Sequence, residues 1–261
     1  MNSLESSAAP AAAPLAIPSP RPPRIWKFWA TCLWGLFIFA ALFVGQIAAV
    51  ALLVLRREGP FDWATVIHVV SGGLTVSLSV IMGLPAVLAA LWIAIRISRT
   101  SFADYLALRW APQRNFLIGV VGMFVLVMTW DLLARATGRE VEPGFMGDVL
   151  KSARADGALW LLVIALCVAA PVSEEFFARG FLYRGWSETF LRPAGAIVLS
   201  ALVWTALHLQ YDWFFSGEVF CIGLLLGYLR YRSNSTWLTV VLHSLNNLAA
   251  LLQGLWLAGP S

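Results

Sequence analysis

The stretch Pro171-Val-Ser-Glu-Glu-Phe-Phe-Ala-Arg-Gly180 places two carboxylates and a guanidinium inside an otherwise apolar run that starts near Leu159. An ionisable residue at the middle of a membrane helix costs about 2.5 to 3.5 kcal/mol, whereas each Leu, Val or Phe contributes about 0.3 to 0.6 kcal/mol. Three charges therefore offset most of the insertion free energy of one helix. Such charges indicate either a functional site within the membrane or a helix end where the side chains reach water.

The spacing of these charges separates the two acids. Glu175 and Arg179 lie four residues apart in the acid-first order, which predicts an ion pair on one helix face. Glu174 lies about 100° further around the helix axis and shares that partner less easily. Pro171 removes a backbone donor and clashes with the carbonyl of Cys167, so a kink or a fresh helix start is expected beside the acids.

The composition is that of an integral membrane protein of the all-α class. Of 261 residues, 60% are hydrophobic and only 12% are charged, whereas soluble domains carry about 25% charge. The net charge of +4 is small and scattered, so nucleic acid is excluded as a partner and the lipid bilayer is expected. Cys32, Cys167 and Cys221 lie in apolar stretches without a Cys-x-x-Cys motif, which argues against disulfides and thiolate metal sites.

Hydropathy predicts a polytopic protein with about seven membrane helices, within a range of six to eight. The second apolar run is long and carries Gly72-Gly73 and Pro85, so tilt or a break is expected there, and the sixth run is short. The first run is expected to be an uncleaved signal anchor. The runs are 30–55, 66–95, 116–133, 159–182, 194–213, 219–231 and 238–257.

These runs divide the chain into three parts. Residues 1–25 are rich in Pro, Ala and Ser and are predicted to form a disordered tail. Residues 26–156 hold the first membrane helices and the amphipathic segment 101–110, which we expect to lie in the cytoplasmic interface. Residues 157–256 form the C-terminal core that carries the intramembrane charges.

The basic residues predict the orientation. With the N-terminus in the cytoplasm, twelve Lys and Arg residues near span ends lie inside and six lie outside, as the positive-inside rule requires. We therefore expect a multi-pass protein of the cell (plasma) membrane with a cytoplasmic N-terminus. Seven helices place the C-terminus outside.

Two further polar pairs lie inside apolar runs of the C-terminal core. Trp204 and His208 are four residues apart, and so are His243 and Asn247, which puts each pair on one helix face. Membrane helices bury polar side chains toward one another, so we expect both pairs to converge with the acids on one site. His68 has no such companions and is interpreted as interfacial.

The expected depths of these side chains in the membrane allow this convergence only if a helix is displaced or kinked. If the fourth and fifth helices are centred near Ala169 and Trp204, Glu174 lies about 7 Å inside the membrane midplane and His208 about 6 Å outside it. The two meet only if the fifth helix lies deeper toward the cytoplasm than its apolar run indicates, or if the kink at Pro171 carries Glu174 back toward the midplane.

The residue types narrow the chemistry. The sequence has no Gly-x-Ser-x-Gly elbow and no His-Glu-x-x-His motif, and Tyr211-Asp212 lacks the Gly-x-Gly-Asp partner of aspartyl intramembrane proteases. A Glu with imidazoles and an amide suits the activation of water, with Glu as base and His or Asn as donors to the developing oxyanion. The same set also suits a divalent metal such as Zn²⁺, which the sequence neither requires nor excludes.

Together these motifs resemble the CPBP family, the CAAX prenyl protease and bacteriocin-processing intramembrane endopeptidases. Glu-Glu-x-x-x-Arg-Gly, an aromatic-x-x-x-His and His-x-x-x-Asn follow in that order between Leu159 and Leu252. Trp204 stands where the family commonly has Phe, and Ala178 where Phe usually precedes the Arg. The resemblance implies these catalytic residues: Glu174, Glu175, Arg179, His208, His243 and Asn247.

The resemblance implies an intramembrane endopeptidase that hydrolyses a peptide bond in a membrane-associated protein or peptide, with or without a prenyl group. The family name implies a metalloprotease, although a glutamate mechanism without a tightly held ion is also described for it. We expect Glu174 to be the general base and Glu175 mainly to hold Arg179. Two other functions stay open: an immunity or scaffold protein that binds a peptide or partner, and a transporter that uses the charges as a relay.

Overall fold

The computed structural model describes residues 23–56, 62–139 and 144–257. Over these residues every regular element is a helix, which confirms the predicted all-α class. Most of the predicted tail lies outside the described residues, as does the side chain of His68. The elements are α1 (Phe28–Leu55), α2 (Trp63–Ser71), α3 (Gly73–Ser98), α4 (Phe102–Leu106), α5 (Gln113–Ala136), α6 (Gly144–Ala155), α7 (Leu159–Ile164), η1 (Ala165–Ala169), α8 (Ala170–Glu175), η2 (Phe176–Leu182), α9 (Tyr183–Ser187), α10 (Arg192–Thr205), α11 (Trp213–Ser233) and α12 (Thr236–Leu257).

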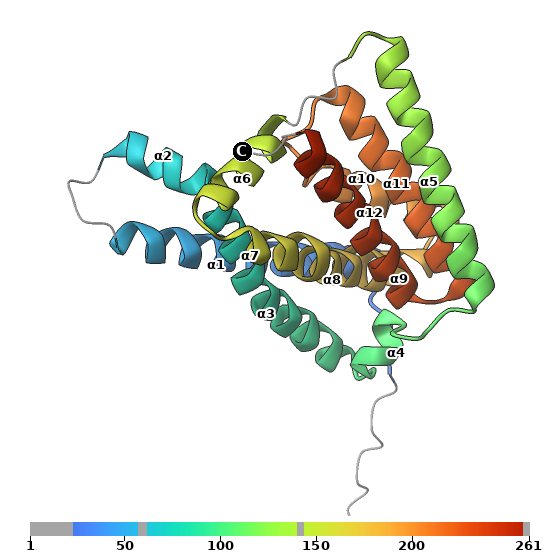
Figure 1. The fold of residues 1–261 in the computed structure, drawn as a ribbon. Coiled ribbons are helices and arrows are strands. Elements are labelled where there is room, and N and C mark those ends of the chain that lie inside the picture. The colour runs from blue at the N-terminus through green and yellow to red at the C-terminus, as the bar shows by residue number, and fades with distance from the viewer. Residues whose placement is uncertain (1–22, 57–61, 140–143, 258–261) are drawn as a thin grey trace, which may run out of the picture.

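Six helices among the described residues are long and apolar enough to cross a membrane. They are α1, α3, α5, the continuous helix Leu159–Ser187 formed by α7 to α9, here called the central helix, α11 and α12. In Figure 1, α5, α10, α11 and α12 gather on one side of the molecule and α1 to α3 on the other, with the central helix between them. The chain is therefore a multi-pass membrane protein.

The short apolar helix α10 is not long enough to be counted among these six. Before it, Phe190 packs against Phe28 at the start of α1, with ring centroids 5.1 Å apart. After it, Asp212 forms an ion pair of 3.0 Å with Arg139 beyond the end of α5. Six candidate spans lie within the predicted range of six to eight, one below the expected seven.

The central helix is the most enclosed of the spans. In its most apolar window 56% of the residues are buried, against 33% or less in the other five. It contains two π-helical turns, η1 just before the acids and η2 around Arg179. Pro171 follows η1 without a break, so the fresh helix start that we considered does not occur. The wider π turn instead accommodates the missing backbone donor.

The α1 and α3 helices pack with close backbone contact. A Cβ atom added to Gly45 would meet backbone atoms of Gly83 and Ser79, so only glycine permits this crossing. The predicted break in the second apolar run occurs at Gly72, between α2 and α3. Pro85 lies inside α3 without ending it.

The segment predicted to be an interfacial helix forms the short α4, and one face of it is buried. Tyr105 stacks on Phe181 of η2 with ring centroids 5.4 Å apart, and burial raises the pKa of its phenol well above the usual range. On the exposed side, the Ser101 hydroxyl and the Arg109 guanidinium lower the pKa of Asp104. The prediction thus identified the exposed half of α4 and missed its support of the central helix. It also missed α6, which packs on α3.

Candidate functional site

Glu175 is the centre of a fully buried ion-pair cluster. Its Oε1 accepts a hydrogen bond of 2.8 Å from Arg179 Nη1 and lies 3.0 Å from His243 Nδ1 of α12. Glu175 and Arg179 are 0% exposed and His243 is 3% exposed. A carboxylate with two such partners is held rigidly, and the cluster ties the central helix to α12. The pair predicted from the four-residue spacing therefore exists.

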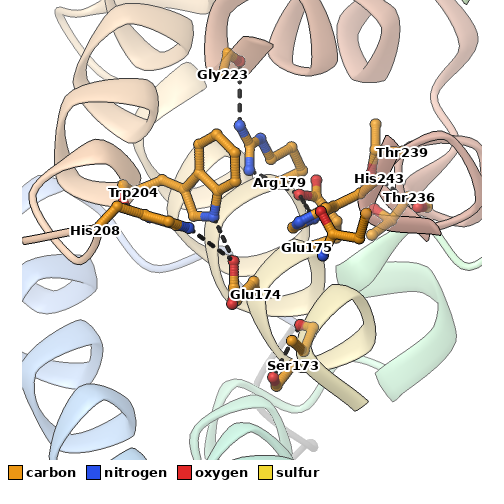
Figure 2. A network of polar contacts seen from close by, with 12 residues as sticks. Ser173, Glu174, Glu175, Arg179, Trp204, His208, Gly223, Thr236, Thr239 and His243 are labelled. Atoms are coloured by element: carbon orange, nitrogen blue, oxygen red, sulfur yellow. Dashed lines mark hydrogen bonds and ion pairs between the residues drawn. The ribbon is translucent and has the colours of Figure 1, made fainter. Parts of the chain in front are cut away.

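Glu174 belongs to a second group on the neighbouring face (Figure 2). Its Oε2 accepts a hydrogen bond of 2.6 Å from the indole Nε1 of Trp204, and His208 Nε2 lies 3.9 Å from the same oxygen. Part of the Glu174 side chain, 23%, remains accessible, whereas Glu175 has none. The two adjacent acids thus occupy opposite environments.

The tautomer of His208 follows from its second contact. Nδ1 lies 2.9 Å from the backbone carbonyl of Trp204, and because a carbonyl only accepts, Nδ1 carries the proton. The same carbonyl also accepts a hydrogen bond of 3.1 Å from the backbone N–H of Leu207. In the neutral ring, Nε2 is therefore an acceptor and faces Glu174.

Trp204 connects the two groups. Its ring lies 4.5 Å from the Arg179 guanidinium carbon and makes edge contacts with His208 and His243 at centroid distances of 4.8 and 5.4 Å. The indole therefore packs against partners of both acids. The structure brings five of the six predicted site residues to this aromatic side chain or its immediate neighbours.

Asn247, the sixth predicted residue, points elsewhere. Its amide nitrogen donates a hydrogen bond of 2.8 Å to the backbone carbonyl of Leu166 in η1. The residue therefore fastens α12 to the π turn that precedes the acids. The amide nitrogen carries a second hydrogen, which this bond does not use.

Two residues that support Arg179 were not predicted as site residues. Arg179 Nη2 donates to the carbonyl of Gly223 at 3.2 Å. Arg230, only 2% exposed, donates from Nε to the carbonyl of Arg179 at 3.1 Å. Arg230 is one of the twelve basic residues that we placed at the inner span ends. Its apolar neighbours on α11 were the signal that it is buried.

Glu174 lines a small pocket beside the acids. None of the other five predicted site residues lines it. It measures about 180 Å³ and lies between the central helix, α1 and α3. Gln46 of α1 also borders a larger apolar pocket of about 450 Å³ that continues toward α2. The lining residues of the small pocket are Leu42, Gln46, Ser79, Val80, Gly83, Leu84, Ala170, Ser173 and Glu174.

Glu174 meets His208 in the turn that follows α10. The helix spans Arg192–Thr205, so the apolar run 194–213 is not one continuous helix centred at Trp204, as the comparison of depths assumed.

The described residues do not assemble a metal site. No three of their His, Cys, Asp and Glu side chains group as ligands. Glu175 is occupied by Arg179 and His243, which leaves Glu174 and His208 as two donors, fewer than the three protein ligands of a catalytic zinc site. The arrangement fits a carboxylate and an imidazole acting on water.

A comparison with known families agrees with the motifs. Residues 156–249 match the family model described as type II CAAX prenyl endopeptidase Rce1-like. No curated protein and no solved structure matches the chain. All six predicted site residues lie inside the matched segment, so the family model agrees with the resemblance inferred from their spacing.

Proposed function

We propose that this protein is an intramembrane endopeptidase that cleaves a membrane-associated protein or peptide with a Glu-activated water. The observation that carries the proposal is the pairing of Glu174 with His208, 3.9 Å apart, beside a pocket that Glu174 lines. The Rce1-like match supports the same activity at the level of the family.

The two acceptors suit one water molecule. Glu174 is a carboxylate, and the Nε2 atom of neutral His208 carries a lone pair, so a water between them donates both of its hydrogens. Its oxygen then attacks the scissile carbonyl carbon while the carboxylate takes one proton. When the tetrahedral intermediate collapses, the C–N bond breaks and that proton passes to the leaving amine.

The remaining residues support this step. A His or Asn side chain suits the role of donor to the oxyanion, and Asn247 keeps one amide hydrogen that its bond to Leu166 does not use. Arg179 compensates the buried Glu175 charge and keeps the central helix turn in place. We therefore assign Glu174 and His208 to proton transfer, and Glu175 and Arg179 to the framework.

The pockets favour an extended substrate with an apolar portion. The 450 Å³ pocket is bounded by α1 and α2 and meets the pocket of Glu174 at Gln46. An apolar side chain or a lipid chain placed there brings the adjoining peptide bond toward Glu174. The apolar pocket is lined by Gln46, Ile47, Val50, Ala51, Val54 and Val66.

The test is cleavage by purified protein in detergent micelles, with matched peptides that carry or lack a C-terminal prenyl group. Glu174→Gln and His208→Ala should abolish cleavage. Glu218 is an acid of α11 that takes part in none of these contacts, so the control variant Glu218→Gln should retain cleavage. Binding without cleavage by the wild type would favour the scaffold function. Proton or solute uptake into vesicles that depends on Glu174 would favour the transporter.

A further inference from the structure

The residue that sets the orientation of Glu174 is one in which this chain departs from the family pattern. Trp204 stands where Phe is common, and its Nε1 donates to Glu174 Oε2 at 2.6 Å. A phenyl ring has no hydrogen to donate, so this bond depends on the indole. It is also short for an N–H donor, as charge-assisted hydrogen bonds are.

The second departure lies in the same place. Ala178, 1% exposed, packs in one apolar cluster with Trp204, which is 3% exposed. A smaller side chain at 178 accompanies the larger one at 204, and interiors tolerate paired changes that conserve total volume. The two departures therefore describe one site built around an indole.

The indole ring is held in position by contacts other than its hydrogen bond to Glu174. One face covers the Arg179 guanidinium, and its edges contact the rings of His208 and His243. Arg179 is itself held by Glu175 and the Gly223 carbonyl. The direction of the indole N–H is thus determined by the buried framework and not by Glu174.

We propose that Trp204 is a positioning residue that gives the two oxygens of Glu174 different roles. Its N–H occupies Oε2, the oxygen that also faces His208, and leaves Oε1 to receive the proton of the water, whose other hydrogen is directed to His208 Nε2. In Figure 2 both dashed contacts of Glu174 end on one oxygen, on the side of Trp204 and His208. A carboxylate that rotates freely can present either oxygen to the water, whereas the Trp204 hydrogen bond holds Glu174 so that Oε1 is presented to it. The proposal rests on the proposed peptidase function.

The decisive variants separate the hydrogen bond from the packing. Trp204→Phe removes the donor and part of the volume, and the double variant Trp204→Phe with Ala178→Phe restores volume without restoring the donor. We expect kcat to fall by about tenfold to hundredfold in both, the range for a misplaced catalytic group, with KM within about twofold of wild type. Recovery of kcat in the double variant would assign the effect to packing and overturn the proposal.

A second measurement does not depend on catalysis. With ¹⁵N-labelled tryptophan in the full-length protein, the Nε1–H resonance of Trp204 is assigned by its loss in Trp204→Phe. We expect it downfield of the other indoles in wild type and shifted upfield in Glu174→Ala. A resonance that ignores the Glu174 substitution would show that the bond does not form, and so overturn the proposal even with cleavage intact. A Glu174-dependent resonance in a protein that cleaves no peptide would confirm the hydrogen bond and refute both the peptidase function and the positioning role of Trp204 in it.

Discussion

The two adjacent acids should respond to the same substitution in opposite ways. Glu175→Gln keeps the shape of the side chain and removes the charge that faces Arg179 at 2.8 Å, in a pair that is 0% exposed on both sides. Glu174→Gln removes the charge of a carboxylate that is 23% exposed and keeps an oxygen able to accept from Trp204. The first should destabilise the fold, and the second should abolish cleavage.

The magnitudes follow from burial. Removing one partner of a buried ion pair costs about 3 to 5 kcal/mol, because the other charge stays in the protein uncompensated. Arg179 keeps its contacts with the Trp204 ring and the Gly223 carbonyl, which limits the loss to about that range. For Glu174→Gln, a hydrogen bond to a charged group becomes a neutral one, a change of about 1 kcal/mol. The two variants should therefore differ by at least about 2 kcal/mol.

The assay is equilibrium unfolding in mixed detergent micelles with rising SDS, followed by tryptophan fluorescence, with Glu218→Gln as the matched control. Cleavage is measured on the same preparations. Equal losses of unfolding free energy in Glu174→Gln and Glu175→Gln would refute the division between base and framework. So would a Glu175→Gln protein as stable as the control.

Four further results are expected. Gly45→Val should lower the unfolding free energy by at least about 1 to 3 kcal/mol, because its side chain meets the backbone of α3; unfolding in detergent measures this, and wild-type stability would contradict the close α1–α3 crossing. Asn247→Ala should lower the unfolding free energy by about 1 to 3 kcal/mol in the same assay, because it leaves a carbonyl of η1 unpaired. An unchanged unfolding free energy would show that Asn247 does not stabilise the contact between α12 and η1. A cysteine at Ser7 should resist an impermeant thiol reagent in intact cells, and ready labelling would reverse the predicted orientation. The losses of cleavage rate in Glu174→Ala and His208→Ala should be strongly non-additive when the two are combined. A double variant whose loss equals the product of the two single losses would show that the two residues act independently.

The sequence predicted those parts of the structure that depend on short spacing or on hydropathy. Glu175 and Arg179 pair because four residues make one helical turn, and this local relation survives any packing. The break at Gly72 follows from glycine's poor helix propensity. Each of these needs only a few consecutive residues, so no long-range information is missing.

The parts that the sequence left open depend on helices far apart in the chain. His243 contacts Glu175 and not Glu174, and either acid was within reach of an unplaced last helix. Arg230 looked like a residue at a span end, yet it is buried because η2 lies against α11. The π turns were not predicted, because the kink expected at Pro171 did not specify which helical hydrogen bonds would change.

The end of α10 at Thr205 shows why hydropathy alone placed His208 wrongly. The apolar run continues to residue 213, but the helix ends at Thr205, and the remaining apolar residues form the turn that leads to α11. Hydropathy reports transfer out of water and does not distinguish a helical residue from one in a turn inside the protein. Non-helical backbone at membrane depth needs its polar groups satisfied by the protein, and at the end of α10 backbone N–H groups do this, with the Leu207 N–H donating to the Trp204 carbonyl at 3.1 Å. The same carbonyl also accepts from His208 Nδ1 at 2.9 Å, and this second bond fixes the imidazole with Nε2 toward Glu174.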